Sequence, residues 1–215
     1  MQRDVQLAIG SDQRGRAGEA ARHIQRCLSF ERDPERSRQS TEALARRLPE
    51  AAAGSIRASH QALVASCQAV DESSRAQLVP LLRRSLAEGD KGAAAGLVRA
   101  LGKDFKLADD PDVLPALRRD AWDCDDSSQR ALSNLARRDP QLLPPNEIGA
   151  LRDLERIQFS KSMEALLRQA EGDPKRQAAL QGMLATYKSP PEADPAEVAR
   201  ISAEIQSRCA AVPGP

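Results

Sequence analysis

The sequence predicts an all-α protein, and its composition is the first reason. Val, Ile, Thr, Phe, Tyr and Trp, which favour strands, make up only about a tenth of the 215 residues, whereas Ala, Leu and Arg contribute 36, 24 and 26. The second reason is that apolar residues recur with a helical period between short polar connections. We therefore expect about ten helices in stacked antiparallel hairpins, forming either a solenoid-like array or an irregular helical bundle.

Asp-Pro steps mark several of the expected helix starts. An Asp oxygen can accept from first-turn amides, and Pro suits the first helical position because it has no N–H to satisfy. The steps are Asp33-Pro34, Asp110-Pro111, Asp139-Pro140, Asp173-Pro174 and Asp194-Pro195. With the apolar period they predict helices near residues 17–30, 34–48, 52–70, 73–88, 91–106, 111–122, 127–138, 146–171, 174–187 and 195–209.

No connection in the chain is long enough to mark a clear domain boundary. We expect a single helical domain over residues 15–209, with a candidate seam near residues 140–146, where Pro144 and Pro145 follow each other. The N-terminal residues 1–14 and the tail 210–215 are expected to be flexible.

The charge balance bears on the class of partner. The chain has 32 basic and 31 acidic residues and only five aromatic ones, so it lacks both the basic excess and the stacking side chains of a nucleic-acid-binding protein. No apolar run reaches the roughly 18 to 20 residues that cross a bilayer. We expect no nucleic acid and no transmembrane segment, and another protein as the partner.

The four cysteines are too far apart in sequence for a zinc or thioredoxin-type site. Each falls on the apolar phase of an expected helix, so we expect all four to be buried. One reading is four reduced core thiols in a cytoplasmic protein. The other is two disulfides, Cys27 to Cys67 and Cys124 to Cys209, which would stabilise a core poor in large side chains by roughly 4 kcal/mol each and indicate an oxidising compartment.

No motif for catalysis, cofactor binding or metal binding is present, so no catalytic residue, cofactor or metal is expected. The acidic segment of residues 120–126 lacks the Gly and the closing Glu of a calcium loop. His23 and His60 lie near cysteines only at the spacing that a helix face already explains. An enzyme whose site uses Asp120, Asp123 and Asp125 remains as an alternative.

Residues 81–98 can be laid against residues 166–184, and both read as a helix, a Gly-Asp turn and a second helix. The corner Leu86-Ala87-Glu88-Gly89-Asp90, followed by Ala93, Ala94 and Leu97, resembles the corner of SEL-like repeats, a branch of the tetratricopeptide superfamily. The first-helix phrase W-Y-x-K-A-A of that family is replaced here by residues 81–86. The resemblance implies a curved helical scaffold that binds another protein and has no catalytic residues.

Pairs of arginines recur late in the expected helices. Helix-dipole matching explains such pairs, and a row of arginines facing a ligand is the alternative, because equivalent positions in a solenoid line one face. The lone Trp122, beside Asp123, either packs between hairpins or anchors a partner. The candidate partner-binding residues are Arg83, Arg84, Arg118, Arg119, Trp122 and Asp123.

These observations together favour a non-enzymatic protein-protein interaction module. The expected form is an exported bacterial helical-repeat adaptor, chaperone or immunity-type inhibitor in the periplasm or secreted, with its export signal absent from this sequence. A secreted effector and a cytoplasmic location are the alternatives.

Overall fold

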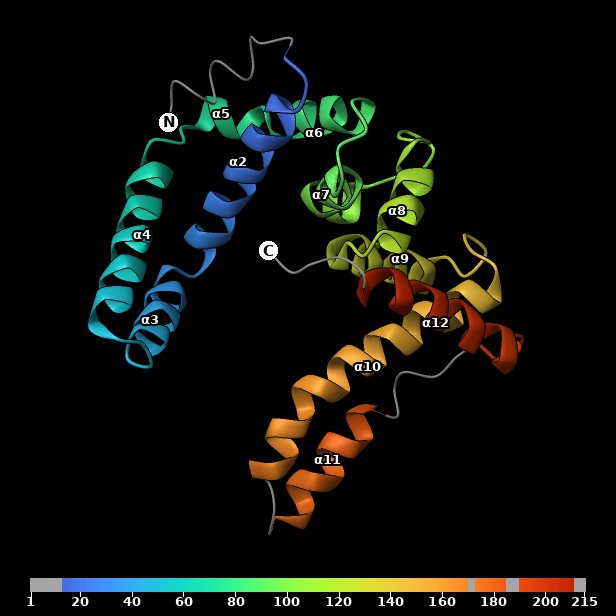
Figure 1. The fold of residues 1–215 in the computed structure, drawn as a ribbon. Helices are drawn as coiled ribbons and strands as arrows, with labels where there is room; N and C mark the ends of the chain where they lie inside the picture. The colour runs from blue at the N-terminus through green and yellow to red at the C-terminus, as the bar shows by residue number, and fades with distance from the viewer. Residues whose placement is uncertain (1–12, 170–172, 185–189, 211–215) are drawn as a thin grey trace. The chain divides into compact units, whose positions relative to one another are not determined.

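The computed structural model describes residues 13–169, 173–184 and 190–210, and in these residues all regular structure is helical (Figure 1). The all-α prediction is therefore confirmed. The expected flexible ends lie almost entirely outside the described residues, as do the residues 170–172 of the second Gly-Asp turn.

The chain divides into two compact units, Met1–Val113 and Leu114–Pro215, and each is described by itself. The division lies before the seam that the sequence indicated near residues 140–146, and that segment falls within the second unit. The first unit contains α2 (Arg16–Arg32), α3 (Pro34–Ala45), α4 (Glu50–Gln68), α5 (Glu72–Ala76), α6 (Leu78–Ala87), α7 (Ala93–Leu101) and the 3-10 turn η1 (Gly102–Asp104). The second contains α8 (Val113–Trp122), which starts at the division, α9 (Asp126–Arg138), α10 (Pro145–Gln169), α11 (Pro174–Leu184) and α12 (Pro195–Ala210).

Helix starts follow the expected capping chemistry at some Asp-Pro steps and depart from it at others. α3, α11 and α12 begin at Pro34, Pro174 and Pro195. At Asp110 the carboxylate binds Arg83 in place of a helix amide, and α8 starts only at Val113. Asp139 follows the last residue of α9, and the next helix begins at Pro145, not at Pro140.

Two of the helices that are shorter than the apolar pattern indicates have a clear local cause. The helix expected over residues 73–88 is broken at Gln77, because Pro80 cannot donate to the carbonyl of Ala76 and its ring would clash there. The helix expected over residues 91–106 stops at Leu101, because Gly102 adopts a left-handed φ of 58°.

The core of the first unit consists of small side chains between closely packed helices. α2 packs against α6 with its buried residues Ala17, Gly18, Ala20, Ala21 and Ile24, and α7 buries Ala93–Leu97. A Cβ on Gly18 would lie 2.6 Å from an Asp90 carboxylate oxygen and 2.8 Å from Ser85 Oγ. α2 can therefore approach α6 this closely only with glycine at that position.

In the second unit α10 and α12 pack against each other. Their buried side chains form a cluster of Ala150, Leu154, Ile201 and Ile205, and Trp122 and Cys209 pack against it while staying partly exposed.

Gly18→Ala should lower the free energy of unfolding by about 1 to 3 kcal/mol, because the added methyl displaces the hydrogen-bonded pair of Ser85 and Asp90. The matched control is Gly54→Ala in α4, where nothing lies within 4 Å of the new Cβ. There the change should stabilise by about 0.5 to 1 kcal/mol through helix propensity. Urea unfolding followed by circular dichroism measures both, and equal effects would contradict the packing of α2.

Candidate partner-binding surfaces

The corner between α6 and α7 is fixed by backbone and side-chain hydrogen bonds. Gly89 has a left-handed φ of 81°, and the amide of Asp90 donates to the carbonyl of Ser85 at 3.0 Å. This is the bond pattern that closes many helix C-termini. Ser85 Oγ donates to the Asp90 carboxylate at 2.7 Å, so the side chains reinforce the same turn.

Glu88 of this corner holds the start of α2. Its carboxylate accepts from the Gly15 amide at 2.8 Å and from Arg84 at 2.9 Å, and its carbonyl accepts from Arg14 at 2.9 Å. The Gly15 amide, followed by Arg84, lowers the pKa of the Glu88 carboxyl. The residues that resemble a SEL-like corner therefore have a structural role within this chain.

The end of α8 repeats the geometry of the end of α6. Cys124 has a left-handed φ of 69°, and the amide of Asp125 donates to the carbonyl of Asp120 at 2.9 Å. When the sequences are aligned at the two corners, residues 78–90 match residues 113–125. The two segments are LVPLLRRSLAEGD and VLPALRRDAWDCD. The shared P-x-L-R-R phrase marks this internal repeat in the sequence, and the repeat pairs residues other than the match between residues 81–98 and residues 166–184.

The candidate arginines occupy matching positions in this repeat, and all of them form ion pairs inside the chain. Arg83 binds both oxygens of Asp110, at 2.8 and 3.0 Å, and Arg118 binds Glu147. The second arginine of each pair bonds locally: Arg84 to Glu88 and Arg119 to Asp120, the latter at 2.8 Å.

These ion pairs give the arginines a positioning role. Asp110 lies just before α8 and Glu147 lies in the first turn of α10, so each first arginine fixes the chain near the start of a later helix. About half of the Arg83 side chain, 51%, is exposed, but its carboxylate partner is only 8% exposed. The sequence suggested two explanations for the arginine pairs, helix-dipole matching and a row of arginines facing a ligand. Neither explanation involves an ion pair with a distant residue of the same chain.

Trp122 and Asp123 differ in their surroundings. Trp122 packs against the apolar cluster of the second unit, as the packing alternative in the sequence analysis requires. Asp123 is exposed, Asp120 is buried beside Arg119, and Asp125 caps α9 by accepting from the Ser128 amide at 2.7 Å. Among the described residues no group of three or more His, Cys, Asp or Glu side chains is placed to hold a metal ion.

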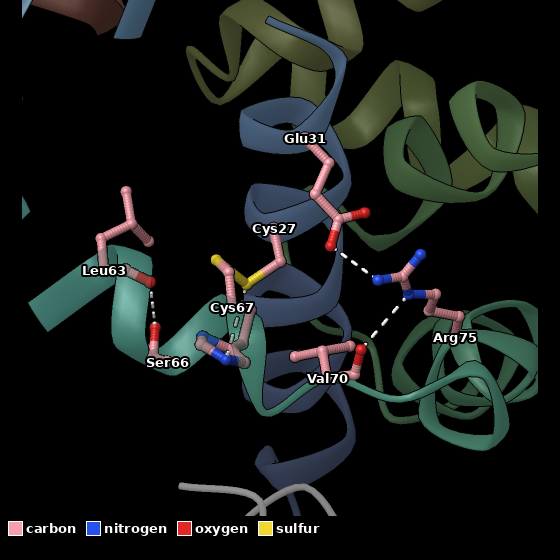
Figure 2. Close-up of a disulfide and its surroundings, with 8 residues drawn as sticks. Cys27, Glu31, Leu63, Ser66, Cys67, Val70 and Arg75 are labelled. Carbon is pink, nitrogen blue, oxygen red and sulfur yellow. Dashed lines mark hydrogen bonds and ion pairs between the residues drawn. A yellow bond between two sulfur atoms is a disulfide. The ribbon is translucent and has the colours of Figure 1, made fainter. Parts of the chain in front are cut away.

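The disulfide Cys27–Cys67 joins α2 to the C-terminal end of α4, with the two Cα atoms 5.0 Å apart (Figure 2). Polar contacts surround it. Arg75 donates to Glu31 at 2.6 Å and to the Val70 carbonyl at 3.3 Å, which ties the segment after α4 to the end of α2. Both sulfurs are buried, as the apolar phase of their helices predicts.

The two histidines lie on the helices that this disulfide joins, His23 on α2 and His60 on α4. His23 Nε2 is 3.8 Å from Sγ of Cys27, which is already bonded to Cys67. The His60 ring makes an edge contact with Phe30, with ring centroids 6.0 Å apart, and its Nε2 lies 3.3 Å from Ser37 Oγ. His60 thus links α4 to α2 and α3.

The second disulfide, Cys124–Cys209, joins the corner after α8 to α12, with the Cα atoms 5.3 Å apart. Both pairings are those that the sequence analysis favoured, and no described cysteine is left free. The expectation of complete burial is wrong for this pair, because Cys124 and Cys209 are partly exposed. Cys124 lies at a turn, outside the regular phase of α8.

The α3–α4 hairpin carries a surface that sequence reasoning did not select. α3 and α4 lie side by side and antiparallel (Figure 1), yet Ala45 is the buried residue of α3. At the end of the hairpin Leu44 is 50% exposed and Leu48 37% exposed, and these are the exposed large apolar residues among those whose side-chain burial the structure describes. Arg46 and Arg47, between them, are exposed. We call residues 44–48 the hairpin tip.

A scan against protein-family models and searches of curated proteins and of solved structures found no match to this chain. Within the described part of the chain no helix has the length and apolarity needed to cross a membrane.

Replacing the first disulfide, in Cys27→Ala/Cys67→Ala, should lower the free energy of unfolding by about 2 to 5 kcal/mol, because the unfolded chain regains the freedom of the closed loop. Chemical denaturation measures the change. Alkylation of the unfolded wild-type protein, with and without prior reduction, checks the bonds themselves, and four reactive thiols before reduction would contradict both disulfides.

The Arg83–Asp110 pair should make stability depend on pH. Arg83 lowers the pKa of the Asp110 carboxyl below its ordinary value of 3.8, so the pair stabilises the fold above that pH and is lost as the pH falls through the lowered value. Arg83→Gln should therefore unfold more easily than wild type at neutral pH, and the difference should shrink below pH 3.8. Denaturation over a pH series measures this, and a pH-independent difference would contradict it.

Proposed function

We propose that this protein is a non-enzymatic protein-binding module and that the hairpin tip is its binding surface. The observation that carries the proposal is the exposure of Leu44 and Leu48 in a fold whose other described large apolar side chains are at least partly covered. A partner with an apolar pocket would remove both side chains from water, which is favourable by about 25 cal/mol for each Å² buried.

The charges at the tip indicate which charges should surround the partner's apolar pocket. Arg46 and Arg47 lie between the two leucines and are exposed, and no ion pair found among the described residues includes either of them. In contrast, Arg57 farther along α4 pairs with Glu42 at 3.3 Å. Carboxylates around an apolar pocket would complement the tip and steer association.

The hairpin is anchored at its opposite end. Cys67 and His60 tie α4 to α2, so the tip extends from a fixed base. A side chain held in place before binding loses less conformational freedom when the partner docks. The disulfide therefore supports recognition by the tip as well as stability.

We further propose that the chain belongs to the exported bacterial helical-repeat proteins, acting as an adaptor, chaperone or immunity-type inhibitor in the periplasm or outside the cell. Two disulfides support the oxidising compartment. The matching corners after α6 and α8 support a relation to SEL-like hairpins. The abundance of Arg and Ala supports a bacterial source with a GC-rich genome.

Leu44→Asp/Leu48→Asp should weaken partner binding, because each change places a charge where the partner's apolar pocket would receive a leucine. A stoichiometric partner is first isolated from a bacterial periplasmic extract and identified, and its affinity is then measured by calorimetry with purified proteins. We expect at least a tenfold loss of affinity for the tip variant, about 1.4 kcal/mol or more.

The control, Ala100→Asp/Ser207→Asp, adds the same two charges at exposed helical positions elsewhere and should bind like wild type. Circular dichroism checks that both variants fold. Unchanged affinity of the tip variant would overturn the assignment of the surface, and metal-dependent turnover without any protein partner would overturn the function.

A further inference from the structure

The face of α4 that points away from α3 and α2 has an unusual composition. Ala51, Ser55, Ala58, Ala62 and Ala65 are all exposed and follow each other at alternating spacings of four and three residues. Their neighbours on the same face, Gly54, Ser59 and Gln61, are also exposed and uncharged. The opposite face, with Ala53, His60 and Cys67, makes the contacts within the unit. Solvent-facing helices normally carry charges on such a face.

The alternation of four and three residues is the period of helices that pair along their length. A repeat of 3.5 residues keeps one seam facing a partner helix over several turns. Small side chains at the seam allow the helix axes to come as close as about 8 Å. The exposed seam of α4 therefore fits another helix with an equally small surface, and α4 itself has such a surface.

The charges at the two ends of α4 select the antiparallel arrangement. Arg46 and Arg47 lie just before the N-terminus of α4, and the exposed Asp71 and Glu72 lie just after its C-terminus. Each pair has the same sign as the adjacent end of the α4 dipole, which is unfavourable within one chain. Two antiparallel copies would place the arginines of each beside the acids of the other.

The seam and the end charges share the same centre. Ala58 is midway along the seam from Ala51 to Ala65, and the midpoint between the arginines and the acids lies next to it. Glu50 is also exposed near the arginines, and the N-terminal end of α4 still carries a net positive charge when Glu50 is counted. A twofold axis near Ala58 therefore satisfies packing and charge together, as an isologous contact requires.

We propose that α4 is a self-association surface through which two copies of this chain form a dimer, with their α4 helices antiparallel about Ala58. This goes beyond the binding of a partner by the hairpin tip. The seam from Ala51 to Ala65 shares no side chain with the tip, and only the end charges Arg46 and Arg47 belong to both surfaces. Because the seam consists of small residues, it buries little area, and we expect a dissociation constant of roughly micromolar order.

Sedimentation velocity of the full chain over a concentration series from about 1 to 200 μM tests the proposal, since this range spans the expected dissociation constant. Wild type should shift from monomer to dimer. Ala58→Glu places a charge at the twofold axis and should weaken association at least tenfold. The control, Ala203→Glu, makes the same change on an exposed face of α12 and should behave like wild type.

A charge exchange tests the arrangement. Arg46→Glu/Arg47→Glu should weaken the dimer severalfold, because like charges then meet at both ends. Adding Glu72→Lys to the same chain should restore part of the lost affinity, because the acidic end then carries no net charge and no longer repels the changed end of the other copy. Circular dichroism checks the fold of each variant.

A wild-type protein that stays monomeric throughout the concentration series would overturn the proposal, including the case in which another part of the same chain covers the seam. Equal effects of Ala58→Glu and Ala203→Glu would overturn it as well. Failure of rescue by Glu72→Lys would overturn the antiparallel arrangement. The titration with the tip's partner, repeated with Ala58→Glu, reports on the hairpin tip separately, so one proposal can fail while the other holds.

Discussion

Close approach of helix backbones is the constraint on which this structure depends, because the chain has few large apolar side chains with which to fill space between helices. Gly18 lets α2 reach the hydrogen-bonded pair of Ser85 and Asp90, and a Cβ on Gly96 would lie 2.7 Å from Leu82 Cδ2. Gln25 crosses the same junction and donates to the Gly96 carbonyl at 3.0 Å. Polar contacts that would be peripheral in a thicker core therefore fix the distances between helices here.

The same constraint explains how the chain uses its charges. Arg83 and Arg118, at matching positions of the internal repeat, reach carboxylates near the starts of later helices. Glu88 holds the start of α2. These groups are engaged inside the chain, and both surfaces that we propose for binding lie on the α3–α4 hairpin. One surface is apolar and basic, at the tip, and the other is a flat seam along α4.

The elements that could be predicted from the sequence are those decided by local chemistry. α3 and α12 start at Asp-Pro steps, and the alternation of apolar residues places Cys27 and Cys67 inside the fold. The break between α5 and α6 is also local, but the apolar period continues across Pro80 and hides it.

The candidate site was less predictable, because its chemistry depends on contacts between distant residues. Nothing near Arg83 in sequence shows that Asp110 is its partner. In the same way, the apolar phase of α3 suggests that Leu44 is covered, and only the sparse packing of the hairpin leaves it exposed. Compositional evidence for a thin core was present, but it does not say which leucines the core leaves out.

The Cys27–Cys67 bridge also changes what a cut in the chain would do. It closes α3, α4 and the tip into a covalent ring, and the arginines at the tip, Arg46 and Arg47, are the kind of site that trypsin-like proteases cleave. A nick there opens the ring without dividing the molecule, so the two pieces stay joined and separate only on reduction. The tip could thus be processed, or lost as a binding element, while the rest of the protein persists as one particle.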